Sequence, residues 1–268
     1  MTTPQGTAAT SVLQLRGATK TFGGLTAVDS LDLDIRKGQI FSIIGPNGAG
    51  KTTVFNLITG IYKPDSGEIL LEGQSISGLT PDRVLRRGIA RTFQNIRLFN
   101  NMTVLENVLV GQHVRFPGDL ASITFHLPNY RRREREAHDR AMDLLGFFGP
   151  SLVARKDDYA SNLSYADRRR IEIARALGSS PKMLLLDEPT AGMNDAETNE
   201  AVTYIQRLRE KHGLTILLIE HKLQVTMGMS DRIAVLDYGR KIAEGTSAEI
   251  QRDERVIEAY LGRKATVE

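Results

Sequence analysis

The segment IFSIIGPNGAGKTT, residues 40–53, decides the fold of this chain. It begins with a short and almost wholly apolar run, which is typical of a strand buried on both faces of a sheet. Residues 45–52 then match the pattern G-x-x-x-x-G-K-S/T, and a helical segment follows. A chance glycine-rich turn is the alternative, but the motif and its strand–loop–helix context are both present.

This loop predicts a phosphate-binding site. Its glycines let backbone N–H groups turn inward around phosphate oxygens, and the helix N-terminus adds a partial positive charge. Lys51 is expected to reach the β- and γ-phosphates of ATP, and Thr52 to bind Mg²⁺. The loop residues predicted to contact the nucleotide are Gly45, Pro46, Asn47, Gly48, Ala49, Gly50, Lys51, Thr52 and Thr53.

Composition sets the outer bounds. A chain of 268 residues suits one large α/β domain with two lobes. The formal net charge of +3 is too small to indicate nucleic-acid binding, and the absence of cysteine excludes disulfides.

Residues 1–11 lack the pattern of a signal peptide and are expected to be a disordered lead. The apolar runs are far shorter than the roughly 18 residues of a membrane span. Any membrane part of the system is therefore expected to be another chain.

Two acidic residues follow the apolar strand 183–186. In open α/β sheets ligands bind at the carboxyl ends of the strands, so Asp187 is expected to hold the Mg²⁺ shell. Glu188 is placed to orient the water that attacks the γ-phosphate. A second strand, 215–219, precedes His221, and its parallel placement favours a catalytic over a structural histidine. Solvated strand-end acids are the alternative, which the phosphate loop makes unlikely.

Residues 163–177, LSYADRRRIEIARAL, predict a capped basic helix. Ser164 and Asp167 form an S-x-x-D pattern that indicates a cap at the helix start. Three arginines at 168–170 then crowd the end of the helix dipole that is unfavourable for cations. This crowding gives some reason to expect an acidic partner, but a solvated helix face is the favoured interpretation.

The remaining elements follow from apolar periodicity and turn residues. Residues 12–35 predict antiparallel strands around Gly23-Gly24, and alternation of helices and strands from Leu163 onward predicts a parallel sheet. The segment 111–162 is expected to be a helical lobe inserted into the sheet domain. The other expected elements are a strand at 68–72 and helices at 103–110, 130–147 and 255–261.

With these residues in place the chain resembles the ATP-binding subunits of ABC transporters from Val12 to Gly262. Residues 163–167 look like the signature motif, Gln94 like the loop glutamine, 191–194 like the D-loop and His221 like the switch histidine. The resemblance implies an ABC-type P-loop ATPase. Its parts would be a RecA-like parallel-sheet core, an N-terminal antiparallel β subdomain, an inserted helical subdomain at about 96–178 and a tail at 263–268.

The resemblance also assigns roles to residues. Catalysis would involve Lys51, Gln94, Glu188 and His221, and Mg²⁺ would be held by Thr52, Gln94 and Asp187. Phe22 would stack on adenine, with a further contact from Val28. Ser164 and Ala166 would face the ATP of a second subunit.

Within the family the chain is most similar to the LivG-like ATPases of branched-chain amino acid importers. The similarity rests on residues 91–99, the Ser164-Tyr165 form of the signature, 191–194, 219–221 and 256–262. Urea and amide importers look much the same, and lipopolysaccharide-export ATPases end similarly. A soluble DNA-repair ATPase would need a long coiled-coil insertion, and a translation ATPase would need two nucleotide domains.

The family resemblance implies partners and a location. Two ATPase subunits, identical or different, would close head to tail around ATP and drive transmembrane permease subunits. A substrate-binding protein would select the cargo, and Ile96–Phe99 could dock the permease. The chain would lie at the cytoplasmic face of the inner (plasma) membrane as a peripheral subunit.

Several residues depart from the family pattern or lie outside the motifs. Ala166 stands where glycine is usual, so its Cβ could crowd the γ-phosphate of the facing subunit or strain the backbone at positive φ. The alternative is that φ is negative and alanine fits. Asn194 and Asp195 stand where aspartate and proline are common. The basic run 131–135 favours a solvated helix face over a lipid or nucleic-acid site. The expected core of the helical lobe is Phe116, Phe125, Phe147 and Phe148.

Overall fold

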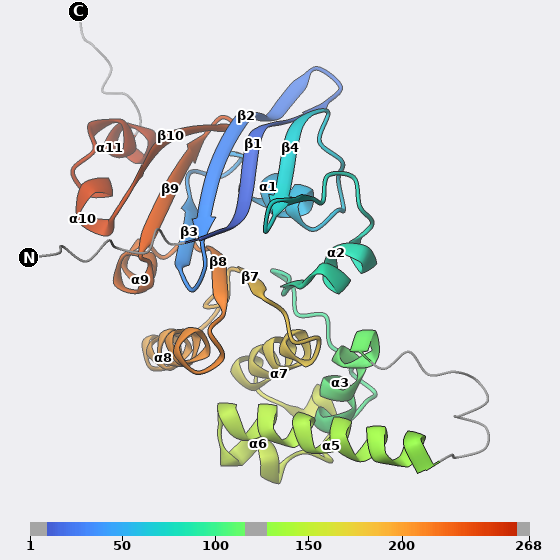
Figure 1. Ribbon diagram of the computed structural model, residues 1–268. Coiled ribbons are helices and arrows are strands. Elements are labelled where there is room, and N and C mark those ends of the chain that lie inside the picture. Colours follow the sequence, from blue (N-terminus) through green and yellow to red (C-terminus); the bar gives the residue numbers. More distant parts are fainter. Residues whose placement is uncertain (1–9, 116–127, 262–268) are drawn as a thin grey trace, which may run out of the picture. The chain divides into compact units, whose positions relative to one another are not determined.

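The computed structural model describes residues 10–115 and 128–261, which form two compact units (Figure 1). Unit 1 contains the described residues of 1–81 and 209–268, and unit 2 contains those of 82–208. The phosphate loop and His221 belong to unit 1. The loop glutamine, the signature and the acidic pair belong to unit 2, which also includes the predicted helical segment.

A four-stranded antiparallel sheet forms part of unit 1, in the order β2-β1-β4-β5. Leu31, Leu33 and Ile35 of β2 are buried while the residues between them are exposed, which is the pattern of a sheet with one covered face. The predicted antiparallel pair around Gly23-Gly24 is confirmed. The strands are β1 (Ser11–Phe22), β2 (Leu25–Arg36), β4 (Ser66–Leu71) and β5 (Gln74–Ser75).

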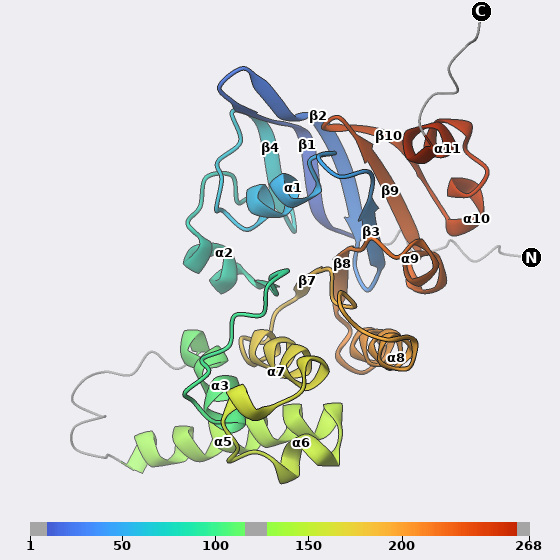
Figure 2. The same ribbon diagram turned by 180° about the vertical axis from the view of Figure 1, so that it is seen from behind.

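The other strands of unit 1 carry the phosphate loop. Strand β3 (Ile40–Ile44) is buried along its whole length and pairs in parallel with β8 (Thr215–Ile219) and β9 (Arg232–Asp237). Strand β10 (Arg240–Gly245) runs antiparallel to β9. Helices α10 (Ser247–Ile250) and α11 (Glu254–Leu261) lie beside β10 (Figures 1 and 2). Unit 1 also contains α1 (Lys51–Ile58) and α9 (Leu223–Met229).

Unit 2 is mainly helical. Within the described residues of this unit, strands β6 (Ile89–Arg91) and β7 (Met183–Asp187) pair in parallel. Sequence analysis did not predict β6, because three residues show no periodicity. The helices are α2 (Pro81–Arg87), α3 (Val104–Gly111), α5 (Pro128–Phe148), α6 (Pro150–Ala154), α7 (Tyr165–Gly178) and α8 (Asp195–His212), with 3₁₀ turns at His113–Arg115 and Ala160–Asn162.

Helices α3 and α7 cross closely because glycines occupy the contact. A Cβ atom on Gly111 would lie 1.9 Å from the carbonyl oxygen of Arg175, and one on Gly178 would lie 3.1 Å from the carbonyl carbon of Gly111. The start of α3 is fixed by a capping box between Thr103 and Glu106. Gly111 is therefore required for this packing, and a Cβ atom at Gly178 would need its neighbours to shift by a few tenths of an ångström.

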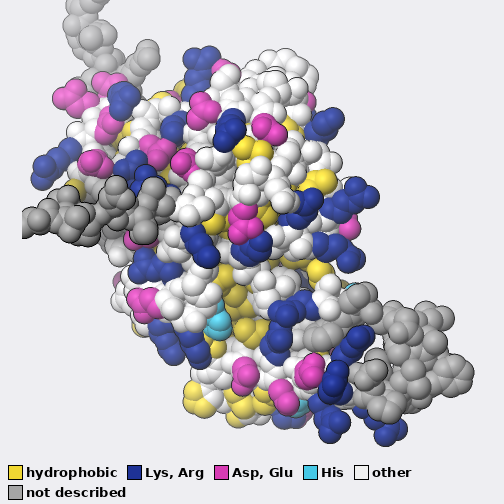
Figure 3. Space-filling model, in the orientation of Figure 1, with side chains coloured by type: hydrophobic (Ala, Val, Ile, Leu, Met, Phe, Trp, Pro, Cys, Tyr) yellow, Lys and Arg dark blue, Asp and Glu magenta, His cyan; other side chains and the backbone are white. Residues whose placement is uncertain are grey.

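Helix α5 is exposed along residues 131–136, where two glutamates are interspersed with four arginines. Figure 3 shows basic and acidic side chains lying side by side over this part of the surface. Arg132 and Glu136 form an exposed ion pair of 3.6 Å, which confirms the prediction of a solvated face. Phe147 and Phe148 are buried with ring centroids 5.1 Å apart, as expected for core residues. Phe116 and Phe125 lie outside the described residues. Within the described residues no helix is long and apolar enough to cross a membrane.

Candidate nucleotide-binding and catalytic site

The phosphate loop adopts a backbone that only glycine allows at its two ends. Gly45 and Gly50 have φ of 151° and 97°. A Cβ atom on Gly45 would lie 2.1 Å from the carbonyl oxygen of Leu236, and one on Gly50 would lie 2.3 Å from that of Ala27. The loop is therefore packed against β9 and β2 as well as being left-handed at these points.

Lys51 is buried in the loop that precedes it. Its ammonium group donates to the carbonyl oxygens of Gly45 at 2.7 Å and Pro46 at 2.8 Å. These contacts keep the cation within the phosphate loop, and its contact with phosphate stays a prediction. Thr52 is exposed at the start of α1, where its hydroxyl can be reached, and Thr53 is half-buried.

Helix α11 also reaches this loop. Partial burial raises the pKa of the Tyr260 hydroxyl above its usual value, and a hydrogen bond with the backbone of Gly45 offsets part of this rise. The C-terminal helix therefore contacts the first residue of the phosphate loop. Sequence analysis missed this contact, because nothing in residues 254–261 indicates what they pack against.

The two residues predicted near the adenine differ in exposure. Phe22 is 41% exposed, and its ring meets that of Tyr62 edge-on at 5.1 Å between centroids. Lys20 Nζ lies 5.4 Å from the same ring. Phe22 can therefore offer a face to a base. Val28 is fully buried, and its contact with a nucleotide stays a prediction.

His221 follows β8 in a turn organised by its neighbour. The buried carboxylate of Glu220 accepts hydrogen bonds from the backbone N–H groups of His221 at 2.9 Å and Lys222 at 3.3 Å. The His221 side chain is exposed. The turn thus presents the imidazole at the carboxyl end of β8, as the sequence predicted.

In unit 2 the first carboxylate of the acidic pair is held by an arginine. Asp187 accepts a hydrogen bond of 2.8 Å from Arg91, and both side chains are 5% exposed. Arg91 ends β6 next to the end of β7, so the parallel pairing of these strands brings the two together. A carboxylate oxygen is a suitable donor for Mg²⁺.

The second carboxylate contacts the loop glutamine. Gln94 Nε2 lies 3.1 Å from each carboxylate oxygen of Glu188. Glu188 has a left-handed backbone with φ of 48°, a conformation that costs a non-glycine residue about 1–3 kcal/mol. The predicted catalytic pair is therefore brought together, and the backbone at Glu188 is held in an uncommon conformation.

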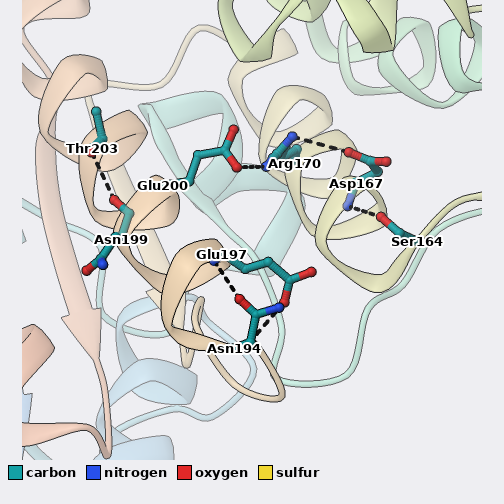
Figure 4. A network of polar contacts seen from close by, with 8 residues as sticks. All are labelled: Ser164, Asp167, Arg170, Asn194, Glu197, Asn199, Glu200 and Thr203. Carbon is teal, nitrogen blue, oxygen red and sulfur yellow. Dashed lines mark hydrogen bonds and ion pairs between the residues drawn. The ribbon is translucent and has the colours of Figure 1, made fainter.

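The signature segment begins α7 as predicted. Ser164 is the N-cap, and its hydroxyl accepts a hydrogen bond of 3.1 Å from the backbone N–H of Asp167 (Figure 4). Ala166 lies in the first helical turn, is buried and does not have positive φ. Backbone strain at Ala166 is therefore excluded, and crowding of a facing phosphate by its Cβ stays a prediction.

The expectation that the signature arginines form a solvated face was wrong. Arg169 is completely buried. Arg168 donates to the side chain of Asn100 at 2.9 Å, and Arg170 pairs with Asp167 on its own helix and with Glu200 on α8 (Figure 4). The error arose because each of the three has at least one acceptor in another segment of unit 2, which helical periodicity does not reveal.

The D-loop departure at Asn194 has a local explanation. Its side chain accepts a hydrogen bond from Glu197 N at 2.9 Å, and Glu197 accepts one from Asn194 N at 3.0 Å (Figure 4). Asparagine therefore serves as a helix cap for α8, and Asp195 lies in the first turn, where the helix dipole favours an acid.

Comparison with known families identifies this architecture. The family model described as ABC transporter matches residues 28–191, and the chain belongs to this family. A second model, described as branched-chain amino acid ATP-binding cassette transporter, matches residues 240–266, which include α11.

Individual proteins agree with the family. The chain is 48% identical over 251 residues to the high-affinity branched-chain amino acid transport ATP-binding protein LivG of Escherichia coli K12, covering 94% of this chain and 98% of LivG. A solved ATP-binding cassette in its ADP conformation superposes with a TM-score of 0.82 at 34% identity, covering 94% and 99% of the two chains. A dimeric cassette bound to ADP and Pi gives a TM-score of 0.73 at 25% identity, covering 88% and 98%. The predicted fold class and family are thus confirmed.

Proposed function

We propose that this chain is the ATP-hydrolysing subunit of an importer of branched-chain amino acids. The observation that carries the ATPase part is the phosphate loop with Lys51 enclosed at 2.7 and 2.8 Å by its carbonyl oxygens. The cargo class is supported by the identity to LivG and by the match of residues 240–266 to the branched-chain amino acid model.

Unit 1 supplies the residues for binding ATP. Backbone N–H groups of the loop and the N-terminus of α1 would surround the phosphates, and Lys51 would turn from its carbonyl acceptors to the β- and γ-phosphates. Phe22 would stack on the adenine ring. Pro46, Asn47, Gly48, Ala49 and Thr53 complete the predicted phosphate contacts.

The acidic pair supplies the residues for hydrolysis. Glu188 would accept a hydrogen bond from the attacking water and orient it toward the γ-phosphate, with Gln94 holding the carboxylate in place. His221 would contribute a further polar contact at the γ-phosphate. Mg²⁺, when bound with ATP, would neutralise charge on the phosphates; the oxygen donors Thr52, Gln94 and Asp187 suit this ion.

A second ATPase subunit is part of the proposal. The similar cassette bound to ADP and Pi is dimeric. In such a dimer Ser164 and the N-terminus of α7 would face the ATP of the opposite subunit, because a capped helix start can bind phosphate oxygens. This placement of Ser164 would be the same whether the second ATPase subunit is identical to this chain or different from it.

Unit 2 also carries a groove suited to a permease segment. Its volume is about 230 Å³, and it lies between α3 and α7. Phe99, predicted to dock the permease, is 50% exposed, and the guanidinium of Arg175 lies 5.8 Å from its ring. We infer that a permease helix with apolar residues and an acidic group occupies this groove, at the cytoplasmic face of the membrane. The groove is lined by Leu85, Ala90, Arg91, Val110, Gly111, Val114, Glu172, Arg175, Ala176 and Ser179.

The test is uptake of labelled leucine by the chain assembled in vesicles with its membrane subunits and supplied with the substrate-binding protein. ATP inside the vesicles should drive uptake, and Glu188→Gln should abolish both uptake and hydrolysis while ATP still binds. Competition by valine and isoleucine, but not by urea or amides, is expected. Hydrolysis without leucine uptake would reject the cargo, and absence of hydrolysis would reject the ATPase assignment.

A further inference from the structure

Among the described residues of unit 2, the most deeply buried cation is Arg169, in the second turn of α7. Its exposed fraction is 0%, and its guanidinium donates to two backbone carbonyl oxygens, those of Phe93 at 2.6 Å and Gln94 at 2.7 Å. It also donates to the carboxylate of Glu172 at 2.7 Å and to the hydroxyl of Tyr165 at 3.2 Å. A single side chain therefore joins the signature helix to the backbone of the loop glutamine.

Glu172 completes this arrangement from the next turn of the helix. Its side chain is 1% exposed, and its second oxygen accepts a hydrogen bond of 3.2 Å from the backbone N–H of Arg97. The pair thus binds the loop on both sides of Gln94. Arg97 in turn stacks over the ring of Phe93, at 4.1 Å from the centroid, which further fixes the loop.

The energetics argue that this pair does more than stabilise the fold. Removing two charges from water costs several kcal/mol per ion, and apolar residues of similar volume often replace a buried pair without loss of stability. Apolar residues, however, cannot donate hydrogen bonds to the carbonyl oxygens of Phe93 and Gln94, which lie in an irregular segment of the chain. The feature specific to Arg169 is therefore the fixed position of the loop backbone.

That backbone carries the side chain that meets the catalytic acid. Gln94 Nε2 is 3.1 Å from both oxygens of Glu188, so a small displacement of the loop would break this bifurcated contact. Arg170, the next residue of α7, points to α8 instead and pairs with Glu200 (Figure 4). Glu172 also lines the groove between α3 and α7. The helix is thus anchored on one side to α8 and on the other to the glutamine loop.

We propose that Arg169 and Glu172 are positioning residues that hold Gln94 in register with Glu188 for hydrolysis. The proposal rests on the proposed ATPase function. It predicts that the pair affects turnover and not ATP affinity, because the phosphate loop and Phe22 belong to unit 1 and make none of these contacts. It also predicts that occupation of the groove influences hydrolysis through Glu172.

The test uses the double substitution Arg169→Met with Glu172→Met, which removes the pair without leaving one buried charge alone. The matched control is Arg132→Met with Glu136→Met, the same change at the exposed pair of α5. Thermal unfolding, kcat and KM for ATP are measured for both, alone and in the assembled transporter. We expect the double variant to stay folded with kcat reduced about tenfold or more, KM within about twofold, and weakened stimulation by loaded binding protein. The control should match the wild type.

Arg169→Lys keeps the charge beside Glu172 but cannot donate to both carbonyl oxygens in one fixed geometry, so kcat should again fall. A folded double variant with wild-type kcat would overturn the proposal. Failure of both Arg169 variants to fold would assign the pair a structural role alone and also overturn it. A wild type that hydrolyses no ATP would instead reject the proposed function, and Glu188→Gln sets the floor for residual activity.

Discussion

Gly111→Ala should destabilise unit 2 because α3 and α7 touch at this glycine. The new Cβ would lie 1.9 Å from the carbonyl oxygen of Arg175, whereas ordinary contacts begin at 3.4 Å, so the helices must separate by about 1.5 Å. Overpacking a core by one methyl group typically costs 1–3 kcal/mol. Since the obstacle is backbone and not a flexible side chain, we expect a loss of about 3 kcal/mol.

Gly146→Ala is the matched control, with the opposite expected sign. Gly146 lies inside α5, and the nearest atom to its new Cβ would be Val153 Cγ2 at 3.9 Å. Alanine here meets no obstacle and removes the entropic cost of a helical glycine, which is worth about 0.5–1 kcal/mol. The same chemical change is therefore predicted to stabilise one helix and destabilise the other.

Thermal unfolding followed by far-UV circular dichroism measures both variants. For a chain of this size each kcal/mol shifts the midpoint by roughly 2–4 °C. Gly111→Ala should lower the midpoint by about 6–12 °C, and Gly146→Ala should raise it by about 1–4 °C. If Gly111→Ala unfolds at or above the wild-type temperature, the reasoning from the close helix crossing is refuted.

Three further variants test the remaining features. Phe22→Ala should raise the KM for ATP roughly tenfold, because stacking of an aromatic ring on a base contributes about 1–3 kcal/mol. Phe22→Tyr keeps the aromatic ring and should leave KM unchanged. Equal KM values for Phe22→Ala and the wild type would exclude stacking. Ala166→Gly should leave the ATPase rate within about twofold of the wild type. It should lower stability by about 0.5–1 kcal/mol, because Ala166 is an unstrained helical residue. A higher ATPase rate would instead mean that the methyl group of Ala166 crowds the facing phosphate. Hydrogen bonds from Lys20 and Thr21 lower the pKa of Asp65 to about 2. The ionised Asp65 therefore contributes its full stabilisation of the fold above the unfolded pKa of about 3.9, and this contribution is lost as pH falls toward 2. Asp65→Asn should remove this part of the acid dependence of stability. An acid-unfolding curve identical to that of the wild type would contradict this prediction.

Sequence alone predicts the parts of the site that are built from local chain geometry. The phosphate loop is one such part, since the left-handed backbone at Gly45 and Gly50 follows from the motif. The cap at Ser164 is another, because its partner is three residues away. Buried strands such as β3 are also predicted, because a continuous apolar run needs two covered faces.

The interactions that sequence did not predict join distant segments. The burial of Arg169 depends on carbonyl oxygens 75 and 76 residues earlier in the chain. The pairing of Arg91 with Asp187 depends on the register of β6 with β7. Periodicity indicates which side of a helix is apolar, and it carries no information about an arginine whose acceptors are backbone groups elsewhere.

The distribution of contacts suggests that affinity and turnover can be changed separately in this protein. The Lys51 ammonium is held by carbonyl oxygens of its own loop, so the contacts of the proposed phosphate site lie within unit 1. Glu188 and Gln94 are held together by contacts within unit 2, including those of Arg169. A substitution confined to one set leaves the other set intact. Changes at Phe22 should therefore appear mainly in KM, and changes at Arg169 mainly in kcat, because binding energy that is equal in the ground and transition states alters only KM.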